Sequence, residues 1–166
     1  AGSAEAPISA DNLQLNAGLG YIAVAAGHIV DVDIDLFPLF LERQSRAIAT
    51  QATVRLVHAA SLAGPVSVFV TEAGEVTDAD VQFAEVAPTL TLNVRANSGY
   101  LALPGGDYDI RIAVPLTDGG YDVVFSQTDT FADGSVLDLI VRNPDENEGE
   151  FEVGVMTVSA STGLSP

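Results

Sequence analysis

Arg55 and His58 are the residues whose types and spacing come nearest to a catalytic arrangement, in the apolar run from Thr53 to Ala60. An imidazole acts as a general base when a nucleophile and an orienting carboxylate lie within hydrogen-bond reach. Ser61 is near in sequence, but the chain has no Gly-x-Ser-x-Gly sequence and no obvious acid partner for the imidazole. We therefore expect structural roles. The ring nitrogens of His58 would hold a neighbouring loop, and Arg55 would pair with a carboxylate across a sheet.

The acidic run Asp31, Asp33 and Asp35, which alternates with apolar residues, is the first candidate metal site. Residues two apart on one face of a strand are separated by about 7 Å. Calcium needs its oxygen ligands within about 2.6 Å. Three such carboxylates therefore cannot all bind one ion without a loop's help. We expect a solvated acidic face, with a shared calcium site as the alternative.

The second candidate metal site is the acidic segment that contains Asp145 and Asn147, followed by Gly149. These alternating positions begin like an EF-hand loop, but the glycine required one residue later is Glu150. We expect a plain turn, with a weak calcium site as the alternative. The acidic pairs at residues 78–80 and 107–109 receive the same interpretation. Zinc is not expected, because the chain has two histidines and no cysteine.

Strands must position these residues, because alternation with a period of two dominates the chain and helical periodicity is almost absent. One strand has a clear apolar side, formed by Tyr108, Ile110, Ile112 and Val114. The residues on its other side are expected to face solvent: Asp107, Asp109, Arg111 and Ala113. Glycine-rich and proline-rich turns separate such runs. This pattern predicts an all-β, antiparallel, immunoglobulin-like sandwich.

Two further segments carry local predictions. Tyr108 follows Pro104-Gly105-Gly106, and we expect its ring in the core with its hydroxyl bonded to the backbone. The polar run from Glu42 to Gln51 is predicted to be a short helix or a linker.

The run from Val54 to Ala60, the turn at Gly64-Pro65 and the strand from Val66 to Val70 resemble the opening of an exported prokaryotic repeat family. The family is domain of unknown function 4397, whose signature begins Val-Arg-Val-Val-His-Ala-Ser. The resemblance covers residues 51–158, although Ser67 stands where the family has aspartate. It implies an immunoglobulin-like tandem repeat of a secreted or cell-surface protein. The family has no assigned active site, so no catalytic role is implied for Arg55 or His58.

The segment before this repeat has a pattern similar to that of the end of the repeat. Gly18 precedes apolar runs at 19–25 and 28–37, and Gly134 precedes apolar runs at 135–141 and 150–158. The two glycines are 134 − 18 = 116 residues apart. We predict an extended or disordered segment at 1–9, closing strands of a preceding repeat at 10–50, a complete repeat at 51–160 and a tail at 161–166. If Ala1 is a natural terminus, the early strands must pack back on this domain or complete a neighbouring subunit.

The charge of the chain limits its partners. The net charge is −17, and all six basic residues are arginine. The resulting negative electrostatic potential repels phosphate groups and anionic lipids, so neither nucleic acid nor membrane surfaces are expected partners. A salt-exposed setting and a GC-rich genome are alternative reasons for the arginine bias. The most apolar window, Gly18 to Leu41, contains His28 and three aspartates, which argues against membrane insertion.

We therefore expect a non-enzymatic structural or interaction module, for example in adhesion, that is extracellular, on the cell surface or periplasmic, although no signal peptide is visible. Its partners would be proteins, or other copies that associate through strand edges, and no cofactor is expected. The alternatives are a self-assembling filament or strand-exchanged oligomer, and a calcium- or carbohydrate-binding module. An enzyme would need a cleft joining His58 to carboxylates on distant strands.

Overall fold

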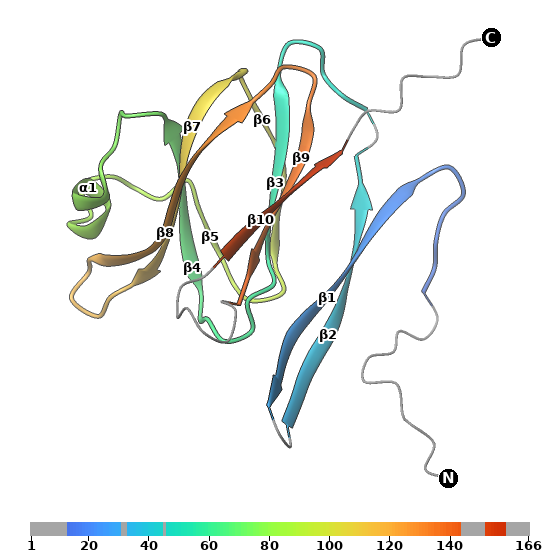
Figure 1. Ribbon diagram of the computed structural model, residues 1–166, viewed down its shortest axis with the longest axis horizontal. Helices are drawn as coiled ribbons and strands as arrows, with labels where there is room; N and C mark the ends of the chain where they lie inside the picture. The colour runs from blue at the N-terminus through green and yellow to red at the C-terminus, as the bar shows by residue number, and fades with distance from the viewer. Residues whose placement is uncertain (1–12, 31–32, 45, 144–151, 159–166) are drawn as a thin grey trace.

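The fold is almost entirely β, as the alternation predicts. The computed structural model describes residues 13–30, 33–44, 46–143 and 152–158, and of residues 28–30, 33–35 and 152–158 it describes only the backbone. The strands and the single described helix are, in chain order, β1 (Gly20–Val30), β2 (Asp33–Arg43), β3 (Ala52–His58), β4 (Val66–Glu72), α1 (Asp78–Gln82), β5 (Leu90–Leu92), β6 (Asn97–Leu103), β7 (Gly106–Pro115), β8 (Tyr121–Phe131), β9 (Val136–Arg142) and β10 (Glu152–Val158) (Figure 1).

Two four-stranded sheets form a sandwich, with strand orders β10-β9-β3-β6 and β5-β4-β7-β8. Neighbouring strands are antiparallel except β3 and β9, which run parallel from Thr53 opposite Val136 to His58 opposite Val141. One continuous core fills the space between the sheets. Its fully buried members include Val54, Leu56, Val68, Ile112 and Leu139. The all-β sandwich predicted from the sequence is thus confirmed.

β1 and β2 form a third, two-stranded sheet beside the sandwich (Figure 1). They pair antiparallel from Gly20 opposite Arg43 to Val30 opposite Asp33. Phe37 and Ala26 of this hairpin form a buried cluster with Ala59, which directly follows β3. All seven residues of β3 are therefore buried, since one face lies in the core and the hairpin covers the other.

The structure corrects the predicted boundary within the hairpin. The sequence suggested strands at 19–25 and 28–37, with a break near Gly27. Instead β1 continues through Gly27 to Val30, and Gly27 pairs with Leu36 inside the ladder. Glycine has a backbone φ of 129° here, so it continues the strand in a conformation that other residues rarely adopt.

Of the two interpretations of residues 42–51, a short helix or a linker, the helix is not found. In the described part of residues 42–51 there is no helix: β2 extends to Arg43, and Ile48 pairs with Gln51 in an isolated bridge. The described helix is α1, which begins after Thr77. The Thr77 hydroxyl accepts from the Asp80 amide, and the Asp80 carboxylate accepts from the Thr77 amide. This reciprocal capping stabilises a five-residue helix that has little helical periodicity.

The outer face of β7 differs from the prediction too. Asp109 and Arg111 were expected to face solvent, yet they are only 8% and 7% exposed. The segment around α1 covers this face with a small cluster built on Phe69, Val81 and Ala113. Among the described residues, no helix is long and apolar enough to cross a membrane.

Candidate functional site

Arg55 lies in a buried polar cluster rather than in a cleft. Its Nε donates to Asp138 Oδ1 at 2.6 Å, directly across the parallel β3–β9 pairing. Its guanidinium lies 4.4 Å from the centre of the Tyr100 ring, and the Tyr100 hydroxyl donates to the same Asp138 oxygen at 3.2 Å. Nη1 donates to the Glu42 carbonyl of β2 at 2.7 Å. The predicted cross-sheet carboxylate is therefore present, and Arg55 also holds the hairpin on the sandwich.

His58 is fully buried on the opposite face of β3 from Arg55, because the two residues are three apart in a strand. Its Nε2 lies 3.0 Å from the Gly64 carbonyl, so it holds the loop before β4 as predicted. Burial lowers the pKa of the imidazole, which favours the neutral ring that donates from Nε2. The Ser61 hydroxyl instead accepts from Asn143 Nδ2 at 3.1 Å.

Tyr108 lies at the edge of the core between the sheets. Its ring stacks on Phe131 with centroids 5.3 Å apart, and its hydroxyl donates to the Pro104 carbonyl at 3.0 Å. Burial raises the pKa of this phenol. The predicted core ring with a backbone-bonded hydroxyl is confirmed.

The candidate metal ligands are not brought together in the described structure. Asp31, Asp145 and Asn147 lie outside the described residues. Asp33 and Asp35 begin β2, where their backbones pair with Val30 and His28, and their side chains are not described. Among the described residues, no three His, Cys, Asp or Glu side chains gather as metal ligands would. The calcium alternative stays a prediction.

A second buried arginine cluster was missed from the sequence. Arg111 Nε donates to Asp78 Oδ1 at 2.6 Å and so ties the first residue of α1 to β7. Asp109 lies beside it and accepts from the Gly74 amide and the Thr128 hydroxyl. These hydrogen bonds lower the pKa of the Asp109 carboxyl. The Thr77-Asp78-Ala79-Asp80 sequence, with a capping residue three before an acid, was the available signal for α1.

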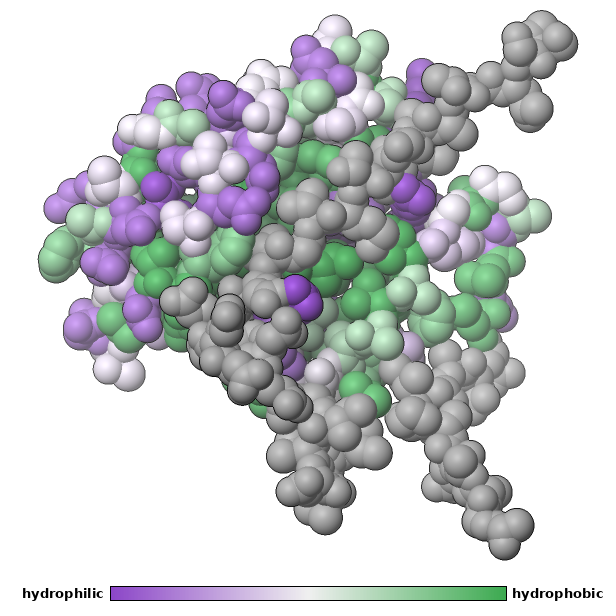
Figure 2. All heavy atoms as spheres, viewed as in Figure 1, coloured by the Kyte–Doolittle hydropathy of each residue, from purple (hydrophilic) through white to green (hydrophobic). Residues whose placement is uncertain are grey.

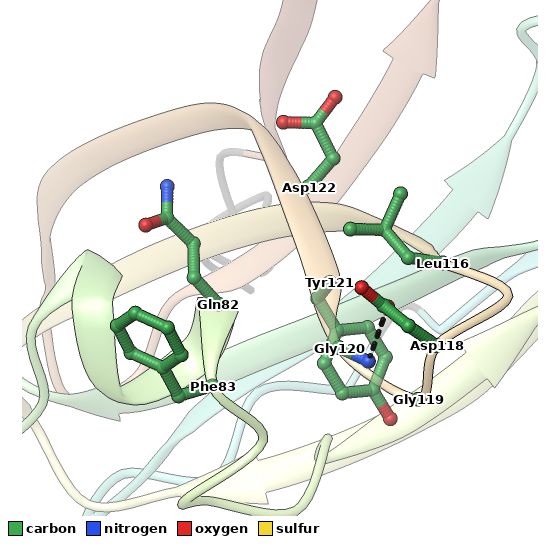
Figure 3. Close-up of a pocket in the computed structure, with 8 residues that line it drawn as sticks. All are labelled: Gln82, Phe83, Leu116, Asp118, Gly119, Gly120, Tyr121 and Asp122. Atoms are coloured by element: carbon green, nitrogen blue, oxygen red, sulfur yellow. Dashed lines mark hydrogen bonds between the residues drawn. The ribbon is translucent and has the colours of Figure 1, made fainter.

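A pocket lined by both polar and apolar residues lies where the end of α1 meets the β7–β8 turn (Figure 3). It has a volume of about 510 Å³. Phe83, 75% exposed, and Leu116 supply apolar surface. Its other lining residues are Gln82, Asp118, Gly119, Gly120, Tyr121 and Asp122.

A glycine keeps the two sides of this pocket together. A Cβ added at Gly120 would lie 2.6 Å from the Gln82 carbonyl oxygen, closer than real side chains approach. The turn therefore contacts the end of the helix only because residue 120 has no side chain. Asp118 accepts a hydrogen bond from the Gly120 amide at 3.2 Å and shapes the same turn.

The outer face of the β1–β2 hairpin is the other notable surface. Its inward side chains include Ile22, Ala26 and Phe37, all buried. The outward side chains come from the alternate positions and are also apolar: Ala23 and Ala25 are exposed, Phe40 is 36% exposed, and Leu36 and Pro38 are half-buried. Figure 2 shows apolar residues gathered over this hairpin, whereas hydrophilic residues are frequent on the visible surface of the sandwich at the end away from the hairpin.

Neither a comparison with models of known protein families nor one with curated proteins finds a match for this chain. The resemblance read from Val54 to Val70 therefore stays a prediction.

Proposed function

We propose that this chain is a non-enzymatic structural or interaction module of an exported protein, located outside the cell, on its surface or in the periplasm. Its interaction element would be the β1–β2 hairpin. The observation that carries the proposal is the hairpin's outer face, where apolar side chains remain exposed on a regular sheet. Contiguous exposed apolar surface of this kind marks interaction sites in soluble proteins.

The internal roles of the chemically competent residues support a non-enzymatic function. Arg55 and His58 lie on opposite faces of β3, so they do not share a site. The Arg55 guanidinium is engaged by Asp138, Tyr100 and the Glu42 carbonyl. Each contact is between segments of the fold, and each stabilises the placement of a strand or loop.

A photo-cross-linking experiment in the cells that naturally produce the protein tests this proposal. p-Benzoylphenylalanine replaces Phe40 on the outer face of the hairpin, and in a control it replaces the exposed Phe83, which directly follows α1. We expect cross-linked protein adducts from position 40 well above those from position 83. Equal or absent adducts from position 40 would refute the hairpin as the interaction element.

The pocket beside Phe83 supports carbohydrate binding as a second candidate function. An exposed aromatic ring stacks on the C–H face of a sugar, and the carboxylates of Asp118 and Asp122 and the Gln82 amide can bond sugar hydroxyls. The test is an NMR titration with a panel of neutral and acidic oligosaccharides. We expect shifts around residues 82–83 and 116–122 that disappear in Phe83→Ala. If no sugar in the panel shifts these resonances at millimolar concentration, this candidate is wrong.

A further inference from the structure

The pocket at the end of α1 has one wall on a fixed helix end. The Phe83 amide donates to the Ala79 carbonyl at 3.0 Å. Ala84 then has a left-handed backbone with a φ of 54°, and the Glu85 amide donates to the Asp80 carbonyl at 2.8 Å. This arrangement is typical of a Schellman helix end, which satisfies the carbonyls of the last turn. The backbone that carries the exposed Phe83 ring is therefore held in place.

The β7–β8 turn forms the other wall and is held just as firmly. The Leu116 amide donates to the Gly120 carbonyl at 2.8 Å, and the Asp118 carboxylate accepts from the Gly120 amide at 3.2 Å. Tyr121, which begins β8, packs edge-on against Phe69 with ring centroids 5.4 Å apart. Figure 3 shows the end of the helix on one side of the pocket and this turn on the other. A ligand therefore meets groups that are already positioned, which lowers the entropic cost of binding.

The pocket has a negative charge. Among the described residues that line it, Asp118 and Asp122 are acidic and none is basic. The last turn of α1 also carries no basic side chain. Arg111, on the strand that leads into the turn, is buried and bonds Asp78 instead. The negative potential of the two aspartates is thus not offset by a cation among the lining residues.

This combination of apolar and acidic groups discriminates between sugars by charge. Phe83 and Leu116, 75% and 46% exposed, offer apolar surface to the C–H face of a sugar ring. A uronic acid or a sulfated sugar would bring an anion to the carboxylates and is repelled. A neutral sugar forms ordinary hydrogen bonds with them. A protonated amino sugar forms charge-assisted hydrogen bonds, which are stronger, and its ammonium group is also attracted to an aromatic face.

We propose that this pocket binds amino sugars, with the C–H face of the ring on Phe83 and the ammonium group held by the carboxylates on the turn side. The inference rests on the proposed carbohydrate binding and names the class of sugar. The chemistry requires a free amine on a pyranose ring, because an acetylated amine carries no charge.

The first test compares three β-1,4-linked tetrasaccharides by NMR titration at about pH 6, below the pKa of an ordinary amine. They differ only at carbon 2, which carries a hydroxyl in the glucose oligomer, an acetamide in the N-acetylglucosamine oligomer and an ammonium in the glucosamine oligomer. We expect all three to shift the resonances of residues 82–83 and 116–122. The dissociation constant of the glucosamine oligomer should be at least about fivefold lower than the other two. Equal constants, or tighter binding of a neutral oligomer, overturn the proposal.

A second test separates sugar recognition from attraction of any cation, which the net charge of −17 favours. Spermine carries the same number of amines as the glucosamine tetrasaccharide but has no sugar ring. We expect spermine to bind the pocket more weakly at about 0.15 M salt, because it has no C–H face to stack on Phe83. Equal affinities would show ion binding alone and overturn the proposal.

Matched substitutions locate the preference within the molecule. Asp118→Asn with Asp122→Asn removes two charges from the pocket and keeps side chains of the same shape. Glu72→Gln with Glu75→Gln removes two charges at the opposite end of β7, where Glu72 pairs with Tyr108. The first variant should bind the glucosamine oligomer no better than the neutral ones, and the second should keep the preference. Loss of the preference in both variants, or in neither, overturns the proposal.

The same titrations distinguish this inference from the carbohydrate binding on which it rests. Equal binding of the three oligomers that disappears in Phe83→Ala would leave carbohydrate binding in place and remove the amino-sugar class. An absence of shifts with all three oligomers would remove both.

Discussion

At the scale of single residues, Arg55 of β3 contacts three other strands. It joins β3 to β9 through Asp138, to β6 through Tyr100 and to β2 through the Glu42 carbonyl. The run around it predicted a carboxylate partner across the sheet. Its identity was not predictable, because 83 residues separate Arg55 from Asp138 and the chain has 23 acidic residues. The pairing of β3 with β9, and its register, place Asp138 rather than another acid opposite Arg55.

Removal of that carboxylate should be costly. Asp138→Ala leaves the Arg55 guanidinium buried without its charge partner, and we expect a loss of about 3–5 kcal/mol in the free energy of unfolding. Urea denaturation measures it. The double variant Arg55→Met with Asp138→Leu removes both charges and should lose markedly less. A double variant as unstable as the single one would show that the pair itself, rather than the stranded charge, carries the stability.

His58 should make stability depend on pH above the range in which carboxylates titrate. Burial lowers the pKa of the folded imidazole below its unfolded value of about 6.5. The unfolded chain then binds a proton first, so stability is greatest above that value. It falls as pH decreases, by at most about 1.4 kcal/mol per pH unit.

Urea denaturation between pH 7.5 and pH 5.5 should show this slope in the wild type. His58→Gln should abolish the slope, whereas His28→Gln should keep it. A slope that survives in His58→Gln would assign the titration to another group.

At the scale of elements, the alternation pattern was sufficient to predict the strands and their packing as a sandwich. It was insufficient to predict which faces are covered. Asp109 and Arg111 read as solvent-facing because they are charged, yet the segment around α1 buries them in an ion-pair cluster. The hairpin likewise covers the outer face of β3. The segment around α1 and the β1–β2 hairpin bury these faces, and neither segment has a sequence pattern that predicts which strand it packs against.

Phe37 should anchor the hairpin. It is 5% exposed in the cluster with Ala26 and Ala59, and the Arg95 guanidinium lies 4.0 Å from its ring centre. Phe37→Ala should cost about 3–5 kcal/mol in the stability of this attachment. Hydrogen exchange should show reduced protection across residues 20–43 and unchanged protection in β3, β4 and β7. Uniform loss of protection would instead mean that the hairpin and the sandwich unfold together.

The pocket at the end of α1 could not be predicted from the sequence. Phe83, Gly120 and Asp122 lie in two segments separated by more than thirty residues, and none belongs to a recognisable motif. Gly120→Ala would bring a Cβ within 2.6 Å of the Gln82 carbonyl, so we expect the turn to move away from α1. Loss of the NMR contacts between residues 82–83 and 118–121, with the core resonances unchanged, would verify it. Unchanged contacts would show that the turn tolerates the side chain.

At the scale of the whole molecule, the net charge of −17 opposes compactness. The Debye length shortens from about 30 Å at 0.01 M salt to about 3 Å at 1 M. We expect the melting temperature to rise over this range in sodium chloride, and to rise similarly in potassium chloride if screening is the cause. A melting temperature independent of salt would show that the acids are too well dispersed to repel.

The parallel pairing of β3 with β9 has a mechanical consequence. The chain enters β3 at Ala52 and leaves β9 at Arg142, and the amino ends of the two strands lie side by side. Tension on the two ends of the sandwich, once β10 has peeled away, therefore pulls these neighbours in opposite directions along their length. Their hydrogen bonds then share the load and must break together. Strands pulled apart from one end would instead break their hydrogen bonds one at a time.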